Sequence, residues 1–301
     1  MINPEQANVG FRSGYVAIVG LPNVGKSTLL NRLTGTHLAA VAPRPQTTRH
    51  RILGILNGAG FQAVFLDTPG LLEPRYALQE QMRHQIDIAL QDADLVMLVL
   101  DAARSDQDAT SYTRLLGGRK VVVVLNKVDL VRDKKELLPT AERLADAGFP
   151  EVFMVSALKG GGVEDLKAAV ATGLPEGQPF YPPDSVADRP EKFFAAELVR
   201  EAVFNLYGAE IPYSTTVVID EFKERPGRKD YVLATIFVER ESQKAIVIGS
   251  GGKALKRVGS RSRREIEAFI GRPVYLELRV KVAEAWRKDE RFIRDNIYGR
   301  D

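Results

Sequence analysis

The chain contains Gly20-Leu21-Pro22-Asn23-Val24-Gly25-Lys26-Ser27, which fits the pattern G-x-x-x-x-G-K-[ST] and indicates the class of fold. The apolar residues 15–19 before it are typical of a buried strand, and residues 27–33 have the pattern of a helix. A glycine-rich turn in this place lets successive backbone N–H groups converge on phosphate oxygens at the positive end of the helix. The stretch therefore predicts a nucleotide-binding phosphate loop, and a purely structural glycine turn is the alternative.

Each residue type in this loop has an expected role. The Lys26 ammonium is expected to reach the β and γ phosphates, and the Ser27 hydroxyl is expected to bind Mg²⁺. Six consecutive residues are expected to contact the phosphates, namely Asn23, Val24, Gly25, Lys26, Ser27 and Thr28.

A second motif, Asn126-Lys127-Val128-Asp129, follows the expected strand 120–125 and indicates which base is bound. The Asp129 carboxylate can accept hydrogen bonds from both the ring N–H and the exocyclic amine of guanine, while Asn126 and the Lys127 stem brace the loop and the base. A site that hydrogen-bonds a substrate group can reject an analogue without that group by roughly 10⁴-fold. Alone the motif is an ordinary polar turn, but after a phosphate loop it favours GTP over ATP.

A third motif, Asp67-Thr68-Pro69-Gly70, ends the expected strand 61–66. From this position Asp67 can reach Mg²⁺ through a water molecule, and the Gly70 N–H can approach the γ-phosphate without obstruction by a side chain.

A fourth motif, Gln46-Thr47-Thr48-Arg49, lies in the polar loop before the second strand. The hydroxyl of Thr47 or Thr48 can add a Mg²⁺ ligand there while the γ-phosphate is present. We expect the metal ligands to be Ser27, Thr48 and Asp67. We expect the catalytic residues to be Lys26, Thr48, Asp67 and Gly70.

A fifth motif, Ser156-Ala157-Leu158-Lys159, follows the expected strand 152–155 and is placed to support the guanine through a main-chain N–H. Its first three residues, Ser156, Ala157 and Leu158, complete the expected nucleotide-binding set. Each motif is weak alone, but all lie at strand ends, where open α/β sheets bind ligands.

Composition fits this interpretation. The 301 residues are enough for two domains, and the contents of 45% apolar and 27% charged residues are ordinary for a globular chain. The chain has no cysteine, which excludes disulfides and thiolate metal sites. No apolar stretch reaches the length of a membrane span, and residues 1–14 lack an apolar signal core. We therefore expect a cytoplasmic protein.

A proline-rich stretch, residues 179–190, predicts an extended linker that belongs to neither core. The expected domains are a nucleotide-binding domain at residues 1–180, a linker at 181–190 and a second domain at 191–301. The second domain is expected to contain helix 191–207, strands 215–222 and 231–238, helix 253–258, a turn at Gly259-Ser260, helix 261–270 and strand 274–280.

The second domain contains the turn Gly249-Ser250-Gly251-Gly252, followed by a stretch, residues 253–264, with six basic residues and no acid. Such a basic run is usually a solvated face. A G-x-x-G turn that opens a helix, however, is the arrangement with which KH domains clamp about four nucleotides. The expected RNA-binding residues are Ile248, Gly249, Ser250, Gly251, Gly252, Lys253, Lys256 and Arg257. Ile246, Ile248 and Leu255 are the expected apolar walls. Trp286 is expected in a C-terminal amphipathic helix, as a core residue rather than a platform on which bases stack.

These motifs resemble those of the bacterial Era GTPases, within the translation-factor type of small GTPase. The likeness rests on Pro22-Asn23-Val24, on Gln46-Thr47-Thr48-Arg49-His50-Arg51 and on Asp67-Thr68-Pro69-Gly70. The order of elements in the second half resembles the type II KH fold. The resemblance implies an α/β P-loop GTPase domain with a mostly parallel six-stranded sheet, followed by a smaller α+β type II KH domain.

The resemblance also implies a function, namely Mg²⁺-dependent hydrolysis of GTP to GDP and phosphate that gates the binding of single-stranded RNA. The implied RNA is the 3′ end of 16S ribosomal RNA during assembly of the 30S subunit, with no DNA partner and with peripheral association at the inner membrane face as a further expectation. Two alternatives stay open. The basic face can bind a protein or an anionic membrane, or the chain can be a GTP-dependent kinase or synthetase, although it shows no acceptor-substrate motif.

Leu71 follows the third motif, where many small GTPases place the glutamine that orients the attacking water. Leucine cannot hydrogen-bond water, so slow intrinsic hydrolysis is expected. In phosphate loops of similar sequence, an asparagine at the position of Asn23 helps to hold a potassium ion against the phosphates. The alternative is that Asn23 only caps the turn.

Overall fold

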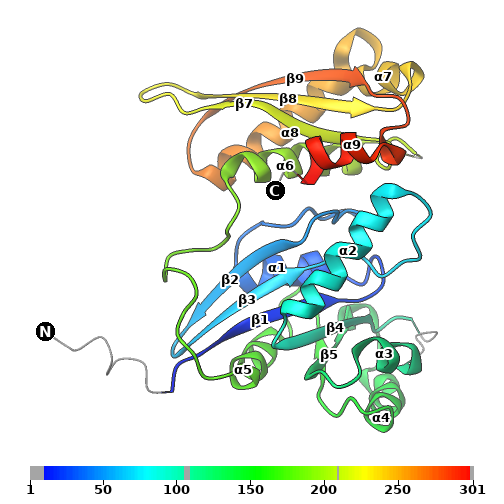
Figure 1. Ribbon diagram of the computed structural model, residues 1–301, viewed down its shortest axis with the longest axis vertical. Helices are drawn as coiled ribbons and strands as arrows, with labels where there is room; N and C mark the ends of the chain where they lie inside the picture. Colours follow the sequence, from blue (N-terminus) through cyan, green and yellow to red (C-terminus); the bar gives the residue numbers. More distant parts are fainter. Residues whose placement is uncertain (1–9, 105–108, 209, 299–301) are drawn as a thin grey trace, which may run out of the picture. The chain divides into compact units, whose positions relative to one another are not determined.

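The computed structural model describes residues 10–104, 109–208 and 210–298. Contacts within the chain divide it into two compact units, coloured along the sequence in Figure 1. Unit 1 comprises Met1–Ala39, Thr48–Leu72 and Arg83–Asp188, and unit 2 comprises Ala40–Thr47, Glu73–Met82 and Arg189–Asp301. The expectation for the N-terminus falls partly on residues 1–9, which lie outside the described residues.

Unit 1 is built on a six-stranded sheet with the order β2-β3-β1-β4-β5-β6. Only the β2–β3 pair is antiparallel, and the four other pairs are parallel. The strands are β1 (Arg12–Val19), β2 (Ile52–Gly58), β3 (Phe61–Asp67), β4 (Leu95–Asp101), β5 (Val121–Asn126) and β6 (Val152–Val155). The expected sheet is thus confirmed, and its central strands are nearly continuous apolar runs because both of their faces are buried.

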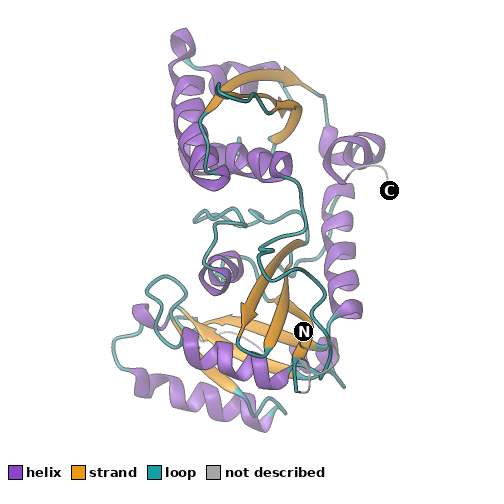
Figure 2. Cartoon of the chain, turned by 90° about the vertical axis from the view of Figure 1, so that its left-hand side faces the viewer, coloured by secondary structure: helices purple, strands orange, loops and turns teal. Residues whose placement is uncertain are grey.

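Helices cover both faces of this sheet (Figures 1 and 2). On one face, α2, α3 and α4 pack through apolar residues such as Ile86, Tyr112 and Leu144. The helices α1 and α5 contact each other and the strands β1, β2, β3 and β6. The helix bounds are α1 (Lys26–Thr34), α2 (Ala77–Asp92), α3 (Ala109–Leu116), α4 (Leu138–Asp146) and α5 (Val163–Gly173). Two 3-10 turns, Val128–Leu130 and Lys134–Leu137, lie between β5 and α4.

The proline-rich stretch after α5 contains no helix or strand, but it is fastened to unit 1. The fully buried Gln62 side chain accepts hydrogen bonds from the Phe180 and Tyr181 N–H groups at 2.7 and 3.0 Å and donates to the Tyr181 carbonyl at 2.8 Å. The Ile55 N–H donates to the Val186 carbonyl. The expectation that this stretch lies outside both cores is therefore wrong for Tyr181, which packs against the core of unit 1.

Unit 2 contains a three-stranded sheet with the order β7-β8-β9, in which β7 and β8 are antiparallel and β8 and β9 are parallel. Apolar residues of α6, α7 and α8 pack on one face of the sheet. Its main elements are α6 (Glu191–Leu206), β7 (Thr216–Lys223), β8 (Asp230–Val238), α7 (Glu241–Ile248), α8 (Lys253–Ile270) and β9 (Val274–Val282). The G-x-x-G turn joins α7 to α8, with a 3-10 turn at Ser250–Gly252.

The expected break at Gly259-Ser260 is wrong, because α8 runs without interruption through both residues. Val258, Ser262 and Ile266 lie one turn apart and are all fully buried. A glycine inside a helix costs about 1 kcal/mol relative to alanine. Burial of one face of the helix outweighs this local preference.

Trp286 lies in the core, as expected, but in a 3-10 turn (Trp286–Lys288) that precedes the short α9 (Glu290–Ile293) and the segment Arg294–Tyr298. Its side chain is 1% exposed, and its indole N–H donates to the Ser214 carbonyl at 2.9 Å. Within the described residues, no helix has both the length and the apolar content that a bilayer crossing requires.

Candidate nucleotide site and RNA-binding groove

The phosphate loop lies between β1 and α1, and its backbone conformation requires glycine at its end. Gly25 is the residue before α1 and has φ 95°. A Cβ atom on Gly25 would lie only 2.3 Å from Asn126 Nδ2. Because no real Cβ makes such a contact, a side chain at this position would displace either the loop or Asn126.

Lys26 is buried and lies across the loop. Its ammonium donates to the carbonyls of Gly20 and Leu21 at 3.1 and 3.0 Å. Burial lowers the pKa of Lys26 to about 8, and the nearby Asp67 carboxylate opposes this shift. The ammonium is therefore still mostly protonated at neutral pH, and phosphate oxygens can replace its two carbonyl partners.

Three oxygen-bearing side chains from separate segments converge beside Lys26. Ser27 Oγ lies 2.7 Å from Thr48 Oγ1 and donates to Asp67 Oδ2 at 2.7 Å. Thr48 Oγ1 also lies 3.3 Å from Asp67 Oδ2. Of the two candidate threonines, it is Thr48 whose hydroxyl lies in this cluster.

The cluster suits a hard cation. Asp67 Oδ1 is buried and has no hydrogen-bond partner among the described residues. Burial raises the pKa of Asp67 to about 6, although Lys26, Ser27 and Thr48 oppose the shift. A buried carboxylate oxygen without a partner, beside two hydroxyls, is a donor set that fits Mg²⁺, which prefers oxygen ligands.

The segment after β3 crosses tightly over the phosphate loop. A Cβ on Gly70 would lie 2.7–2.8 Å from three atoms of Pro22, so the close approach requires glycine. The Leu71 N–H donates to the Gly20 carbonyl at 3.0 Å, and the Thr68 hydroxyl donates to the Ile18 carbonyl at 2.7 Å. The Gly70 backbone is thereby held against the loop that is expected to bind phosphate.

Asn126 joins the phosphate loop to the fifth motif. Its Nδ2 donates to the Val24 carbonyl at 2.8 Å, and its Oδ1 accepts from the Ala157 N–H at 3.0 Å. Both ends of the amide are thus used within the protein, so Asn126 braces the loops around the site.

Asp129 is exposed at the rim, and its Oδ1 accepts from the Ser156 hydroxyl at 2.6 Å. The same hydroxyl accepts from the Lys159 N–H at 3.0 Å. Lys127 has φ 65°, and its ammonium pairs with Asp101 at 2.6 Å. The carboxylate is thus oriented by a neighbour, and the lysine stem is fixed beside it.

Sequence reasoning missed two residues that hold this rim, Arg32 and Asp101. Arg32 on α1 donates to the Ala157 carbonyl at 2.9 Å and to the Leu158 carbonyl at 2.6 Å. No local pattern identifies Arg32, because its partners lie about 125 residues further along the chain. Asp101 could have been suspected, since it ends the apolar strand β4 at the same edge of the sheet.

In unit 2, the G-x-x-G turn adopts a conformation that favours glycine at three positions. Gly249, Gly251 and Gly252 have φ of 72°, 57° and 73°. Their left-handed backbone disfavours any side chain with a Cβ. The turn therefore presents a bare backbone at the start of α8.

Beside this turn lies a groove of about 420 Å³ between α8 and β9. It is lined by Gly252, Leu255, Lys256, Gly259, Ser260, Arg263, Leu276 and Leu278. Of the expected apolar walls, only Leu255 lines it, and Ile246 is 53% exposed outside the lining. Leu276 and Leu278 also line the groove but were not predicted. They lie two positions apart on β9 and therefore on the same side of the strand, so the alternation of apolar residues in 274–280 could have identified them.

Comparison with known families separates the same two parts of the chain. Residues 15–127 match the family model described as 50S ribosome-binding GTPase, and residues 210–287 match the KH domain model. The chain is 46% identical to the GTPase Era of Geobacter sp. (strain M21) over 295 residues, covering 96% of this chain and 98% of that protein. It is 40% identical to the GTPase Era of Thermotoga maritima, with coverage of 96% and 98%.

Solved structures agree with these relatives. A variant of Aquifex aeolicus Era bound to GDP and AlF₄⁻ has a TM-score of 0.92 and 39% identity, covering 96% of this chain and 100% of that chain. A structure of Era in complex with MgGDPNP and nucleotides 1506–1542 of 16S ribosomal RNA has the same TM-score and identity, with coverage of 96% and 99%. The similarity extends over both domains. This chain belongs to the Era family of GTPases.

Proposed function

We propose that this Era-family GTPase is a molecular switch that binds the 3′ end of 16S ribosomal RNA through its KH domain during assembly of the 30S subunit. The convergence of Ser27, Thr48 and Asp67 beside Lys26 supports the nucleotide half of the proposal. The groove beside the G-x-x-G turn supports the RNA half. The similar Era structure with bound 16S ribosomal RNA indicates which RNA to test.

At the nucleotide site, the chain's own groups bind and orient GTP. Lys26 and the backbone amides of residues 23–28 contact the phosphates, and the Gly70 N–H approaches the γ-phosphate. Ser27 and Thr48 would ligate Mg²⁺ directly, and Asp67 would do so through water. When bound, the metal ion neutralises charge that develops on the phosphate oxygens.

Base selection is assigned to the rim of the site. Asp129, oriented by Ser156, accepts from guanine, while Asn126 and Lys127 hold the loops and the Ala157 and Leu158 backbone supports the base. Loss of the γ-phosphate releases residues 42–51 and 70–83, which is the order–disorder change typical of GTPase switches.

Potassium is a further candidate cofactor at Asn23. The Asn23 side chain is exposed and makes no hydrogen bond within the described part of the chain. Its φ of 66° is left-handed, a conformation that asparagine tolerates. An amide oxygen without a partner next to the phosphate loop favours ion binding over a capping role.

The RNA half is tested by crosslinking the protein to RNA in cells and sequencing the attached RNA. We expect enrichment of the 3′ end of 16S ribosomal RNA, which also places the protein in the cytoplasm, where subunits are assembled. Binding to anionic lipid vesicles, measured beside RNA binding at several salt concentrations, tests peripheral membrane association. Crosslinks spread evenly over cellular RNA would contradict the proposed target.

The Gly251→Asp/Gly252→Asp variant gives a sharper test, because it adds bulk and negative charge where phosphates approach. We expect it to lose single-stranded RNA binding and to keep GTP binding. A Gly118→Asp/Gly148→Asp variant is the matched control, since both glycines have positive φ and open space around them but lie in unit 1. Normal RNA binding by the first variant would contradict the assignment of the groove.

We also propose a nucleotide-binding domain at residues 1–180, a linker at 181–190 whose Tyr181 packs against the core of unit 1, and a second domain at 191–301. They are tested by expressing residues 191–301 alone and measuring whether this fragment unfolds cooperatively and binds short single-stranded RNA.

A further inference from the structure

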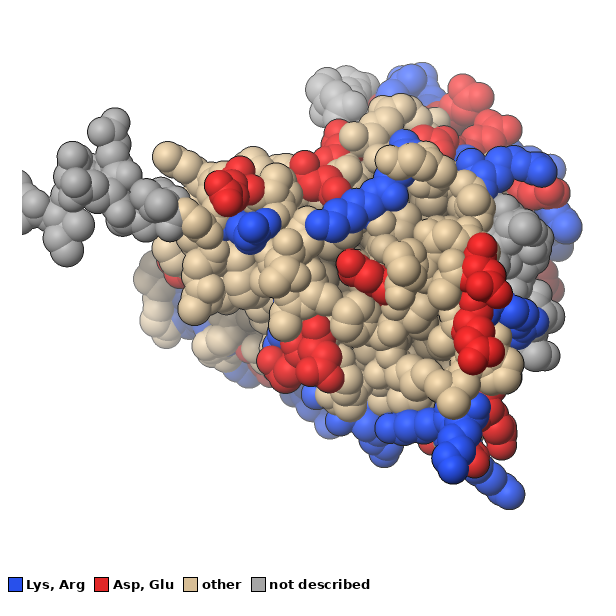
Figure 3. All heavy atoms as spheres, turned by 90° about the horizontal axis from the view of Figure 1, so that it is seen from below, with Lys and Arg blue, Asp and Glu red and all other residues tan. Residues whose placement is uncertain are grey.

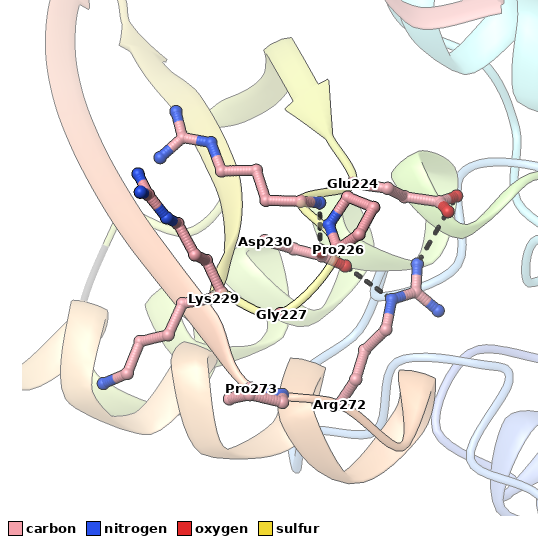
Figure 4. A pocket seen from close by; sticks show the side chains of 9 residues that line it. Glu224, Pro226, Gly227, Lys229, Asp230, Arg272 and Pro273 are labelled. Carbon is pink, nitrogen blue, oxygen red and sulfur yellow. Dashed lines mark hydrogen bonds and ion pairs between the residues drawn. The ribbon is translucent and has the colours of Figure 1, made fainter.

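The hairpin between β7 and β8 forms a second basic site in unit 2, a pocket of about 580 Å³ that we call the hairpin site (Figure 4). It contains four basic side chains, Arg225, Arg228, Lys229 and Arg272, and two acidic ones, Glu224 and Asp230. The function described above makes no use of this site.

The hairpin is held in a defined shape. The Arg228 N–H donates to the Arg225 carbonyl at 3.0 Å, Pro226 follows Arg225, and Gly227 has φ 73°. These are the features of a type II turn. The Arg225 N–H also donates to Asp230 Oδ1 at 2.9 Å, so the turn presents Arg225 and Arg228 from fixed positions.

Arg272 neutralises the acidic groups around the pocket. It pairs with Glu191, Asp230 and Glu224, and Figure 4 shows its guanidinium directed to the last two. Desolvation opposes ionisation of the buried Asp230, but hydrogen bonds from Arg225 and Arg272 hold its pKa below the ordinary value. Arg272 therefore has a structural role.

The other three cations have no such partners. Arg225, Arg228 and Lys229 are exposed, and none of them forms an ion pair within the described residues. By contrast, basic and acidic side chains are interspersed on the face of the molecule drawn in Figure 3. Three exposed, unpaired cations on one hairpin are the charge arrangement that phosphate groups neutralise.

Planar side chains extend the hairpin site onto the face of the sheet that lies opposite α6, α7 and α8. The Arg225 guanidinium lies 4.8 Å from the centre of the Tyr231 ring. The Tyr231 and Tyr275 rings are nearly parallel, at 15°, with centres 6.0 Å apart, and Tyr275 is 56% exposed. Exposed aromatic rings and guanidinium planes are the groups on which unpaired RNA bases stack.

The C-terminal segment covers a different part of this face. Phe237 lies on the same side of β8 as Tyr231, because the two residues are six positions apart in a strand with a period of two. The Phe292 ring of α9 packs edge-on against Phe237, at 5.3 Å between centres. The α9 helix thus contacts the far end of β8, whereas Tyr275 at the hairpin end is exposed to solvent.

The hairpin site and the G-x-x-G turn lie at opposite ends of α8. The turn precedes Lys253, and Arg272 follows Ile270 by two residues. The 18 residues of α8 span about 27 Å at a rise of 1.5 Å per residue. The groove between them reaches only as far as Arg263 along α8, so the two sites are separate.

We propose that the hairpin site is a second RNA-binding site, which holds the sugar-phosphate backbone and one stacked base of the RNA beyond the segment clamped at the G-x-x-G turn. The inference rests on the proposed function. A KH clamp holds about four nucleotides. The RNA in the similar Era complex spans nucleotides 1506–1542, which is 37 nucleotides, so most of such an RNA lies beyond a clamp of this size and is available to a second site.

The test compares two RNAs on the full-length protein. One is a short single strand that fills only the groove, and the other is a 16S 3′-end RNA of nucleotides 1506–1542 that contains the same sequence. The Arg225→Glu/Arg228→Glu/Lys229→Glu variant is expected to bind the short strand within twofold of wild type, which also shows that the KH domain is folded. It is expected to bind the long RNA at least tenfold more weakly, with a salt dependence flatter by about two to three units of slope.

An Arg132→Glu/Lys134→Glu/Lys135→Glu variant is the matched control. It changes the net charge equally with three exposed residues of unit 1, and it is expected to bind both RNAs as wild type does. Unchanged binding of the long RNA by the hairpin variant would overturn the second site. Failure of wild type to bind either RNA would instead overturn the proposed function.

Stacking is tested separately at Tyr275. Tyr275→Phe keeps a flat ring and is expected to bind the long RNA within twofold of wild type, whereas Tyr275→Ala is expected to bind it at least fivefold more weakly. Equal binding by the two variants would rule out a stacked base at this position. If the hairpin variant instead lost binding only to vesicles with anionic lipids, the site would belong to a membrane surface and the RNA assignment would be wrong.

Discussion

The amide of Asn126 lies directly against the backbone of Gly25, with Nδ2 only 2.3 Å from the place that a Cβ on Gly25 would occupy. The same Nδ2 donates to the carbonyl of Val24 at 2.8 Å. The motif assigned to the base is thereby fixed to the loop assigned to the phosphates. A substitution in either loop should therefore weaken the binding of both the base and the phosphates.

Replacement of Gly25 by alanine should therefore disrupt the site. Gly25→Ala adds both backbone strain, at φ 95°, and a collision with Asn126. Gly35→Ala is the matched control, because Gly35 has φ 72° but open space around its Cβ position. We expect a loss of about 1–3 kcal/mol in unfolding free energy from strain in both variants. Only Gly25→Ala should also lose at least tenfold in GTP affinity, as measured by calorimetry, and equal affinities would contradict this steric account.

Asp129→Asn should change the preferred base. The amide can donate to the oxygen that replaces the exocyclic amine in xanthine, so GTP binding should weaken and xanthosine triphosphate binding should improve. Lys26→Ala should lose affinity for both triphosphates. Competition binding with the two nucleotides measures the preference, and a variant that still prefers GTP would remove Asp129 from its assigned role.

GTP hydrolysis should depend on potassium through Asn23. We expect faster hydrolysis in potassium than in sodium at equal ionic strength, and no difference in Asn23→Gly. Glycine is the suitable replacement, because it removes the amide but tolerates the left-handed backbone at φ 66°. Equal wild-type rates in both salts would exclude the potassium site. Because Leu71 cannot orient the attacking water, hydrolysis would then depend on a protein or RNA activator.

Asp67 should make the nucleotide-free protein less stable as pH rises. Its pKa is raised from 3.8 to about 6 in the folded state, so the folded protein holds this proton more tightly than the unfolded chain. The stability cost is absent below about pH 4, grows as pH rises to about 6 and is full above it. The unfolding free energy of wild type minus that of Asp67→Asn should therefore fall by about 2–3 kcal/mol between pH 4 and pH 7. Urea unfolding with EDTA at both pH values measures this, and a constant difference would contradict the shift.

Gln62 should control the attachment of the segment after α5. Gln62→Ala removes the acceptor of the part-buried N–H groups of Phe180 and Tyr181, and each lost hydrogen bond costs about 0.5–1.5 kcal/mol. We expect faster proteolysis within residues 178–186, with little change in GTP affinity. Gln91→Ala is the control, because Gln91 is an exposed residue of α2 that makes no hydrogen bond to this segment within the described residues. Equal cleavage rates in the two variants would show that Gln62 does not hold the segment.

The sequence alone determined the nucleotide half of this protein to a large extent. The phosphate loop, Asp67–Gly70 and the Asn126 motif are short and contiguous, and each follows an apolar run that predicts a buried strand. Because parallel strands end at one edge of a sheet, the order of these motifs was enough to predict that they meet. The G-x-x-G turn was likewise identified by its own residues.

Interactions between residues far apart in the chain could be identified only from the folded structure. Arg32 reaches carbonyls about 125 residues away, and Gln62 holds a segment about 118 residues away, so no window of sequence contains either interaction. The Gly259-Ser260 pair predicted a break locally, but burial of Val258 and Ile266 against the sheet keeps α8 continuous. Local motifs specify chemistry because their residues are neighbours in the chain, whereas bracing contacts and helix continuity follow from packing that brings distant residues together.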